Sequence, residues 1–368
     1  MKNKSKKFLI QNSKELFLLT FELFLFCLFC LLPTAYCFSQ DIHFSQFYMN
    51  PLAMNPANAG ADRNEMQAIL NYKDQWRSVA SPYKTIALSC DKRIQKKKSA
   101  MDFWAVGINF FNDKAGDINM KTFQANISAA YHHYLSKEKY SSVGVGLQTG
   151  FAQRSISYDA VTWGNQFDGN SYNPFLPTGE PASGTSYAYG DFLSTGVLYS
   201  YNNTSGRIKV TDNHELKVNL GFSVFHITQP KYSFYESGEK IYMKYVLHGN
   251  ALLSVPNTNI AFAPGFMYFR QGPAQEIYPG TLIRYKLRQA SKYTGYYKSM
   301  AISVGAFLRM KDAIAPVVLF ENAGYSIGLS YDVNVSDLKV ASTGRGGFEI
   351  SLKYQMPVRA IYGSRSKF

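Results

Sequence analysis

Six histidines are the residues of this sequence best suited to chemistry, as metal ligands or as general acids and bases. None belongs to an H-E-x-x-H pair, and none has a carboxylate at the spacing of a metal ligand. His132 and His133 are adjacent in an expected strand, so their side chains face opposite sides and cannot hold one ion together. The sequence therefore predicts no metal site. The histidines are His43, His132, His133, His214, His226 and His248.

Motifs for phosphate binding and nucleophilic catalysis are also weak. The stretch Gly144–Gly150 faintly resembles a phosphate loop, but it lies within an alternating strand and no helix follows it. No G-x-S-x-G elbow occurs. Hydrolases built on membrane barrels need only a scattered serine and histidine, so the absence of a motif does not exclude an enzyme. We nevertheless predict no catalytic residue, no cofactor and no enzymatic activity.

Stretches of about ten residues that alternate apolar and polar side chains recur from residue 64 to the end, for example at 123–132, 143–151 and 216–224. Successive side chains of a strand point to opposite faces, so each stretch has one apolar face and one polar face. A tilted strand needs about 9–11 residues to cross a bilayer. A soluble β-sandwich shares the alternation, but the abundance of Tyr and Phe favours a transmembrane antiparallel β-barrel, because aromatic girdles mark its two interfaces.

Fourteen strands are expected, an even number as in bacterial barrels of one chain. Those at 83–91, 276–288 and 313–321 have the weakest alternation, so twelve strands remain possible. With a periplasmic N-terminus, the longest connection, 154–190, lies outside the cell. The expected strands span 64–73, 83–91, 101–111, 119–134, 141–153, 191–202, 214–226, 240–253, 258–270, 276–288, 296–309, 313–321, 324–333 and 346–354.

The first 39 residues predict a secretory signal peptide: a basic start, an apolar run at 16–32 and small residues before the cleavage site. An uncleaved anchor is the alternative, although Thr20 and Glu22 interrupt the run. Cleavage leaves Cys90 as the single cysteine, so no internal disulfide can form. The net charge of +14 would fit nucleic acid, but an exported protein rarely meets it. We predict a protein of the outer membrane, in contact with its lipid and not with nucleic acid.

Residues 40–63 do not alternate and contain prolines and asparagines between aromatic side chains. An apolar but irregular segment must be buried, and the lumen of the barrel is the obvious place. We expect a plug-like segment before the barrel at 64–354, and a short tail at 355–368 after it. Its candidate residues are His43, Phe44, Phe47, Tyr48, Pro51 and Pro56.

Basic residues gather in the connections expected at the periplasmic end, above all Lys96, Lys97 and Lys98. They are either a solvated rim or a docking face for an acidic periplasmic partner. The long external connection carries aromatic side chains of the kind that dominate protein interfaces. It is either packed over the barrel mouth or a binding surface for a cargo protein. Its candidate residues are Trp163, Gln166, Phe167, Tyr172 and Phe175.

Several blocks in a fixed order resemble the PorP/SprF family of outer-membrane proteins of the type IX secretion system. The resemblance covers essentially the whole chain after the signal peptide, although Asp41-Ile42 replaces the usual Asp-Pro. The blocks are Asp41-Ile-His-Phe-Ser-Gln-Phe-Tyr, Asn50-Pro51, Asn55-Pro56-Ala57, Asn71-Tyr-Lys-Asp-Gln-Trp76, Thr162-Trp-Gly-Asn-Gln-Phe-Asp168, Leu176-Pro-Thr-Gly-Glu180, His226 with Pro230, Gln271-Gly-Pro273, Ser330-Tyr-Asp-Val-Asn-Val-Ser-Asp-Leu338 and Gly347-Phe-Glu-Ile-Ser-Leu352.

The resemblance implies a barrel similar to fourteen-stranded fatty-acid transporters, with a role in secretion, gliding or surface attachment. It implies as partners a cargo or adhesin with a type B C-terminal domain, a periplasmic peptidoglycan-binding lipoprotein and motor-linked subunits. The alternative function is a channel for the uptake of small molecules or lipids, with residues 40–62 as its hatch.

Overall fold

The computed structural model describes residues 41–62, 64–78, 81–95, 101–116, 118–157, 161–179, 186–203, 215–232, 239–288, 299–336 and 339–357. The predicted signal peptide, residues 1–39, and most of the predicted tail lie outside these ranges. Among the described helices, none is long and apolar enough to cross a membrane.

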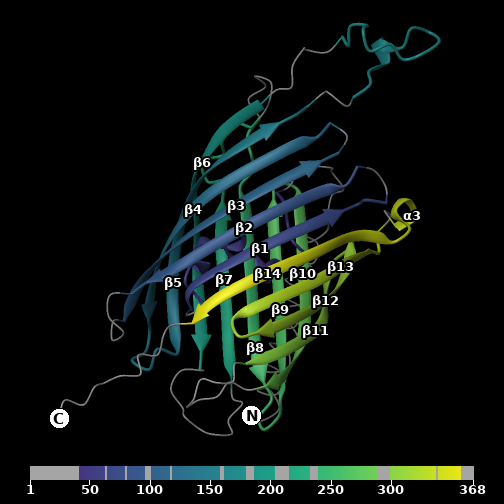
Figure 1. Ribbon diagram of the computed structural model, residues 1–368. Helices are drawn as coiled ribbons and strands as arrows, with labels where there is room; N and C mark the ends of the chain where they lie inside the picture. The colour runs from purple at the N-terminus through teal and green to yellow at the C-terminus, as the bar shows by residue number, and fades with distance from the viewer. Residues whose placement is uncertain are drawn as a thin grey trace, which may run out of the picture.

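Fourteen antiparallel strands close into one barrel (Figure 1), in which each strand pairs with its neighbours in sequence and β1 pairs with β14. Closure leaves no continuous free edge along the wall, as lipid requires. The strands are β1 (Asn64–Gln75), β2 (Tyr83–Ile94), β3 (Asp102–Ala115), β4 (Met120–Tyr134), β5 (Ser141–Ser155), β6 (Ser186–Asn202), β7 (Leu216–Phe225), β8 (Lys244–Ser254), β9 (Ile260–Gln271), β10 (Ala274–Arg288), β11 (Met300–Arg309), β12 (Ala313–Asn322), β13 (Tyr325–Asn334) and β14 (Arg345–Pro357).

The predicted strand number is confirmed, and the three weakest strands are present as β2, β10 and β12. The ends differ from the expectation in places. β6 begins at Ser186, before the expected residue 191, because Tyr187 and Tyr189 continue the pairing with β5. β14 runs to Pro357, past the expected end at 354, because Gln355, Met356 and Pro357 still pair with β1.

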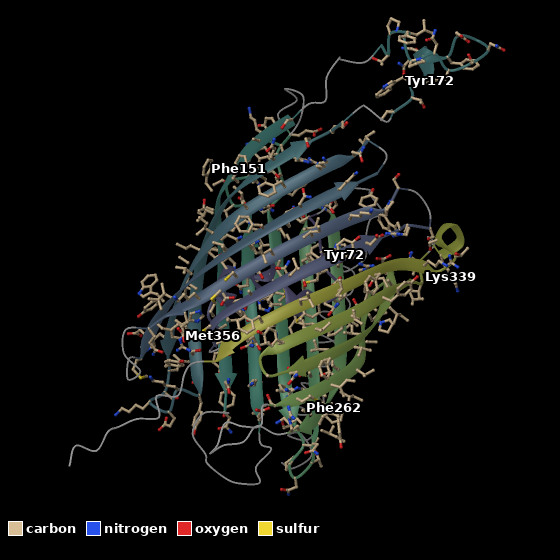
Figure 2. All side chains as sticks on the ribbon, in the orientation of Figure 1. Tyr72, Phe151, Tyr172, Phe262, Lys339 and Met356 are labelled. Carbon is tan, nitrogen blue, oxygen red and sulfur yellow. The ribbon has the colours of Figure 1, made fainter. Side chains whose placement is uncertain are left out.

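The outer face is apolar along the wall. In β5, Val143, Val145 and Leu147 are exposed while the glycines between them are buried, and in β14 Phe348 and Leu352 point outward while Glu349 and Ser351 are buried. Figure 2 shows Phe151 and Phe262 projecting from the outside of the barrel. This outward apolar surface suits the hydrocarbon of a bilayer. His132 is buried and His133 is exposed, which confirms that the two face opposite sides.

The barrel has two ends that differ in their connections. We call the end that carries the β5–β6 connection the loop end; the short helix α3 (Lys339–Ser342), between β13 and β14, lies there as well (Figure 1). The other end, where β14 finishes, is the opposite end. The β5–β6 connection contains the 3-10 helix η3 (Gly164–Gln166).

Residues 41–62, which we call the N-terminal segment, lie in the interior of the barrel. The segment consists of η1 (Phe47–Met49), α2 (Pro51–Met54), η2 (Pro56–Asn58) and short irregular links. Asp41 contacts side chains at the loop end, from β8 and β9. Asp62 contacts Lys353 near the opposite end. The segment therefore passes along the lumen from one end to the other.

Candidate functional site

The start of the N-terminal segment is held by a cluster of charged and polar groups at the loop end. The Asp41 carboxylate lies 2.9 Å from His226 Nε2 and 3.3 Å from Lys244 Nζ, and it accepts a hydrogen bond of 3.1 Å from Gln271 Nε2. The Asp41 amide donates in return to Gln271 Oε1 at 2.8 Å. Three side chains thus fix Asp41 through four contacts.

These charges reinforce one another. Burial raises the pKa of Asp41, but the charges of Lys244 and His226 and the hydrogen bonds from His226 and Gln271 hold it well below its usual value. Burial lowers the pKa of His226, but Asp41 and Asp191 raise it, to about 9. At neutral pH the pair is therefore a carboxylate and an imidazolium, each stabilised by the other.

A second buried cluster surrounds Arg309, at the loop end of β11. Its guanidinium contacts Asp332 at 3.0 Å and also pairs with Asp312. It donates to His43 Nε2 at 2.8 Å. Burial and the charges of Lys73 and Arg309 lower the pKa of His43 well below 6.5, so the ring is neutral and accepts this bond. The arginine thus links the segment to β13.

The carboxylate of Glu349, on β14, accepts two backbone hydrogen bonds from the segment, from Ser45 at 2.7 Å and from Gln46 at 2.9 Å. The Ser45 hydroxyl donates to Asp332 at 2.6 Å. Backbone amides of an irregular segment must find acceptors when they are buried. The inward carboxylates of the barrel provide them here, so the wall and the segment complete each other's hydrogen bonds.

Apolar packing holds the middle of the segment. Phe47 lies edge-on to Tyr278 and Phe307, with ring centroids 6.0 and 5.2 Å apart. Phe47 and Met54 belong to a buried apolar cluster with side chains of β7 to β12, and Leu52, further along, is fully buried. Of the residues predicted for this segment, Phe44, Phe47 and Pro56 are buried, while His43, Tyr48 and Pro51 are partly buried.

Glycines of the barrel wall let the segment approach the strands closely. A Cβ on Gly146 would lie 2.3 Å from the Ala57 nitrogen, and one on Gly196 would lie 2.1 Å from the side-chain oxygen of Asn55. The Asn55 side chain donates to the Val197 carbonyl at 2.9 Å. The glycines that faintly resembled a phosphate loop therefore serve packing in the lumen.

A cavity remains between the start of the segment and the wall. Its volume is about 30 Å³, and its lining is mainly apolar. Lys244 provides a charge on its wall. Its lining includes Ile42, His43, Phe44, Lys244, Val246 and Met267.

The five residues predicted on the long loop divide into exposed and buried ones. Phe167 and Tyr172 are exposed and form a short antiparallel bridge with each other, and Phe175 is 94% exposed. Gln166 is buried and donates to the carbonyls of Pro174 and Leu176, and Trp163 is partly buried. Figure 2 shows Tyr172 beyond the strand ends, away from the barrel mouth. The loop is folded on itself around Gln166 and presents three aromatic side chains.

Two further predictions concern the basic connection and the metal ligands. Lys96, Lys97 and Lys98 lie outside the residues that the structure describes. Within the described ranges, no group of three or more His, Cys, Asp and Glu side chains is placed to hold a metal ion.

Comparison with known proteins supplies the family. The model of the family "Type IX secretion system membrane protein PorP/SprF" matches residues 37–354. The chain belongs to this family. The predicted resemblance is thereby confirmed, and this PorP/SprF protein is an outer-membrane β-barrel of the type IX secretion system.

No curated protein matches the sequence of this PorP/SprF protein. Among solved structures, the translocator domain of the autotransporter NalP from Neisseria meningitidis is similar at 10% identity, with a TM-score of 0.38, over 85% of this chain and 96% of that one. The toluene transporter TbuX from Ralstonia pickettii gives 9% identity and a TM-score of 0.42, over 83% and 94%. BamA from Haemophilus ducreyi, lacking POTRA domains 1–3, gives 9% identity and a TM-score of 0.37, over 79% of this chain and 70% of that one.

Sequence reasoning missed three polar partners of the segment in this PorP/SprF barrel: Gln271, Arg309 and Asp332. Each is a polar residue on the inward face of a strand or at its loop end. A full charge on a face that is otherwise small or apolar was the available signal, since buried charges need partners. The identity of the partner was not available, because it lies hundreds of residues away in the chain.

Proposed function

We propose that this PorP/SprF protein receives a type IX-secreted cargo, such as an adhesin with a type B C-terminal domain, at its loop end, which then faces outside. The support is the aromatic surface of Phe167, Tyr172 and Phe175, which is exposed beyond the strand ends. Aromatic side chains remove much apolar area from water and dominate binding energies at interfaces. Exposed aromatic side chains on a folded loop are suited to contact with a partner protein.

The loop is shaped in advance for such a role. The Asp168 carboxylate accepts from the amides of Asn170 and Ser171 at 2.9 and 2.7 Å, and Asn165 donates to the Thr178 carbonyl at 3.2 Å. A surface that is ordered before binding loses less conformational entropy when the partner arrives. These bonds keep the three aromatic side chains on one small frame.

The test is a triple substitution of Phe167, Tyr172 and Phe175 by serine, in cells whose own copy has been deleted. We expect the barrel to insert normally and the cells to lose surface-retained proteins with type B C-terminal domains, counted by mass spectrometry. The matched control is Asn170→Ala, exposed on the same loop. Normal cargo display by the triple variant would reject the proposal.

We propose further that the N-terminal segment is a plug. The support is its course along the lumen and its contacts with inward side chains of β8, β9, β13 and β14. Deleting residues 41–62 should then raise the conductance of the purified barrel in planar bilayers. An uptake channel, the alternative function, predicts instead that the intact protein conducts in a substrate-dependent manner. The plug is supported if the intact barrel does not conduct and the barrel without residues 41–62 does.

We propose finally that Lys96, Lys97 and Lys98 bind an acidic periplasmic partner, such as a peptidoglycan-binding lipoprotein linked to the motor subunits. The support is the run of positive charge in the connection after β2, and electrostatic complementarity of this kind acts most strongly at low salt. Reversing the three lysines to glutamate should reduce recovery of the lipoprotein in pull-downs at low ionic strength. Unchanged recovery there would count against docking, and the basic residues would then be a solvated rim.

A further inference from the structure

The two parts of the N-terminal segment differ in what dominates their attachment to the barrel. Residues 47–60, the anchor, are packed against apolar side chains and wall glycines, and hydrogen bonds such as those from Asn55 to Val197 and from Ser223 to Met54 add to this packing. Residues 41–46, the head, are attached mainly through polar groups: Asp41, His43, Ser45 and Gln46. Water can replace a polar partner, whereas removing apolar packing leaves a void. The head is therefore the part of the segment that can leave its seat.

One residue, His226, joins the head to two other elements. His226 directly follows β7 and has a positive φ of 56°. Its Nε2 lies 2.9 Å from Asp41 of the head, and its Nδ1 lies 2.8 Å from Asp191 of β6. Its backbone amide donates to the Ser194 hydroxyl of β6 at 3.2 Å. The charged groups around it are thus Asp41, Asp191 and, across Asp41, Lys244.

β6 is irregular where it meets His226. The pairing with β5 shifts between Gln148 and Gly150, which leaves Phe192 and Leu193 both pointing outward. The pairing of β6 with β7 begins only at Thr195. The stretch Ser186–Asp191 is therefore paired with β5 but not with β7. A bulge interrupts and bends the ladder, so displacement of this stretch leaves the pairing of β6 with β7 intact.

The head also borders a small cavity. The cavity, of about 30 Å³, lies between Ile42, His43 and Phe44 on one side and β8 and β9 on the other. The wall on that side is apolar apart from Lys244, which already contacts Asp41. Because residues 41–46 belong to no strand, their displacement breaks no strand pairing.

We propose that the head is a gate whose latch is His226, and that displacement of the loop end of β6 releases it. This inference rests on the proposed plug. β6 follows directly on the long loop that we propose binds cargo. A force on that loop therefore acts on the start of β6, where Asp191 lies. When Asp191 withdraws, the His226 ring loses the carboxylate that fixes its orientation and helps to keep it charged, so its attraction to Asp41 weakens. The anchor stays in place throughout.

Amide hydrogen exchange on the purified, full-length barrel in detergent tests the latch. We compare His226→Asn and Asp191→Asn with the wild type, and read residues 41–46 and residues 50–60 as separate peptides. Exchange of the head should accelerate roughly tenfold in both variants, since its closed state loses an ion pair. The anchor should exchange as in the wild type. The matched control is His133→Asn, because His133 pairs with Asp102 on the outer face.

Asp191→Asn decides the coupling, because Asp191 reaches the head through its contact of 2.8 Å with His226. In the double variant, head exchange should equal that of His226→Asn alone. Unchanged head exchange in His226→Asn, or equal acceleration of head and anchor, would overturn the latch. The conductance of the 41–62 deletion is read independently, so a plug that fails and a latch that fails are told apart.

Discussion

Gly146 of β5 lies directly against the backbone of Ala57, so that a Cβ at this glycine would come within 2.3 Å of the Ala57 nitrogen. The contact joins the wall to the anchor of the N-terminal segment through two backbones. A backbone cannot move aside as a long side chain can. The distance between wall and segment is therefore set here by the absence of a side chain.

Gly146→Val should displace the anchor or bend β5. Overpacking of this kind costs about 1–3 kcal/mol, so we expect the midpoint of thermal unfolding in detergent to fall. The control is Gly164→Ala, since a Cβ at Gly164 meets nothing within 4 Å. An unchanged midpoint for Gly146→Val would mean that the segment does not rest against β5.

Phe47→Ala should destabilise the folded barrel, because Phe47 is buried among Tyr278, Phe307 and other apolar side chains. Removing a buried phenylalanine leaves a cavity and costs about 3–5 kcal/mol. Unfolding in urea from detergent micelles measures the loss. Phe175→Ala is the matched control, since that side chain is 94% exposed; equal effects of the two substitutions would contradict the packing.

Arg309→Met should be more damaging than Arg309→Met combined with Asp332→Leu. The single change leaves the carboxylate of Asp332 buried without its main partner, with the more distant Lys73 and the Ser45 hydroxyl beside it. Breaking a buried pair on one side costs about 3–5 kcal/mol, whereas replacing both members by apolar groups often costs little. A double-mutant cycle of unfolding free energies checks this. Additive losses would show that the two residues do not interact.

The ion pair between His226 and Asp41, which holds the head, should weaken in alkaline solution. The pKa of His226 is raised to about 9 in the folded protein, above its ordinary value of about 6.5. Its contribution is therefore fully present below about pH 6.5 and is lost as the pH rises through 9. The ratio of head to anchor exchange rates, in which the intrinsic pH dependence cancels, should rise near pH 9. His226→Asn should show no such step, and a step in that variant would assign the transition to another group.

Much of the wall was predictable because a strand's pattern is local. Val143, Val145 and Leu147 point outward for the same reason that Gly144 and Gly146 point inward: side chains alternate along an extended backbone. The first residue of β6 was harder to predict. Its first residues, Tyr187 and Tyr189, alternate with small ones, and only their pairing with Arg154 and Ala152 shows that the strand has begun.

The amino-acid sequence by itself determined the alternation and the apolar exterior, it narrowed the strand number to fourteen or twelve, and it carried the blocks that indicate the PorP/SprF family. The tertiary structure decided that β14 closes on β1 and that Asp41, His226 and Asp191 meet at one point. The physical reason is the separation along the chain over which each kind of interaction acts. Periodicity acts over neighbouring residues, whereas a partner across the lumen depends on the register and twist of all the strands between.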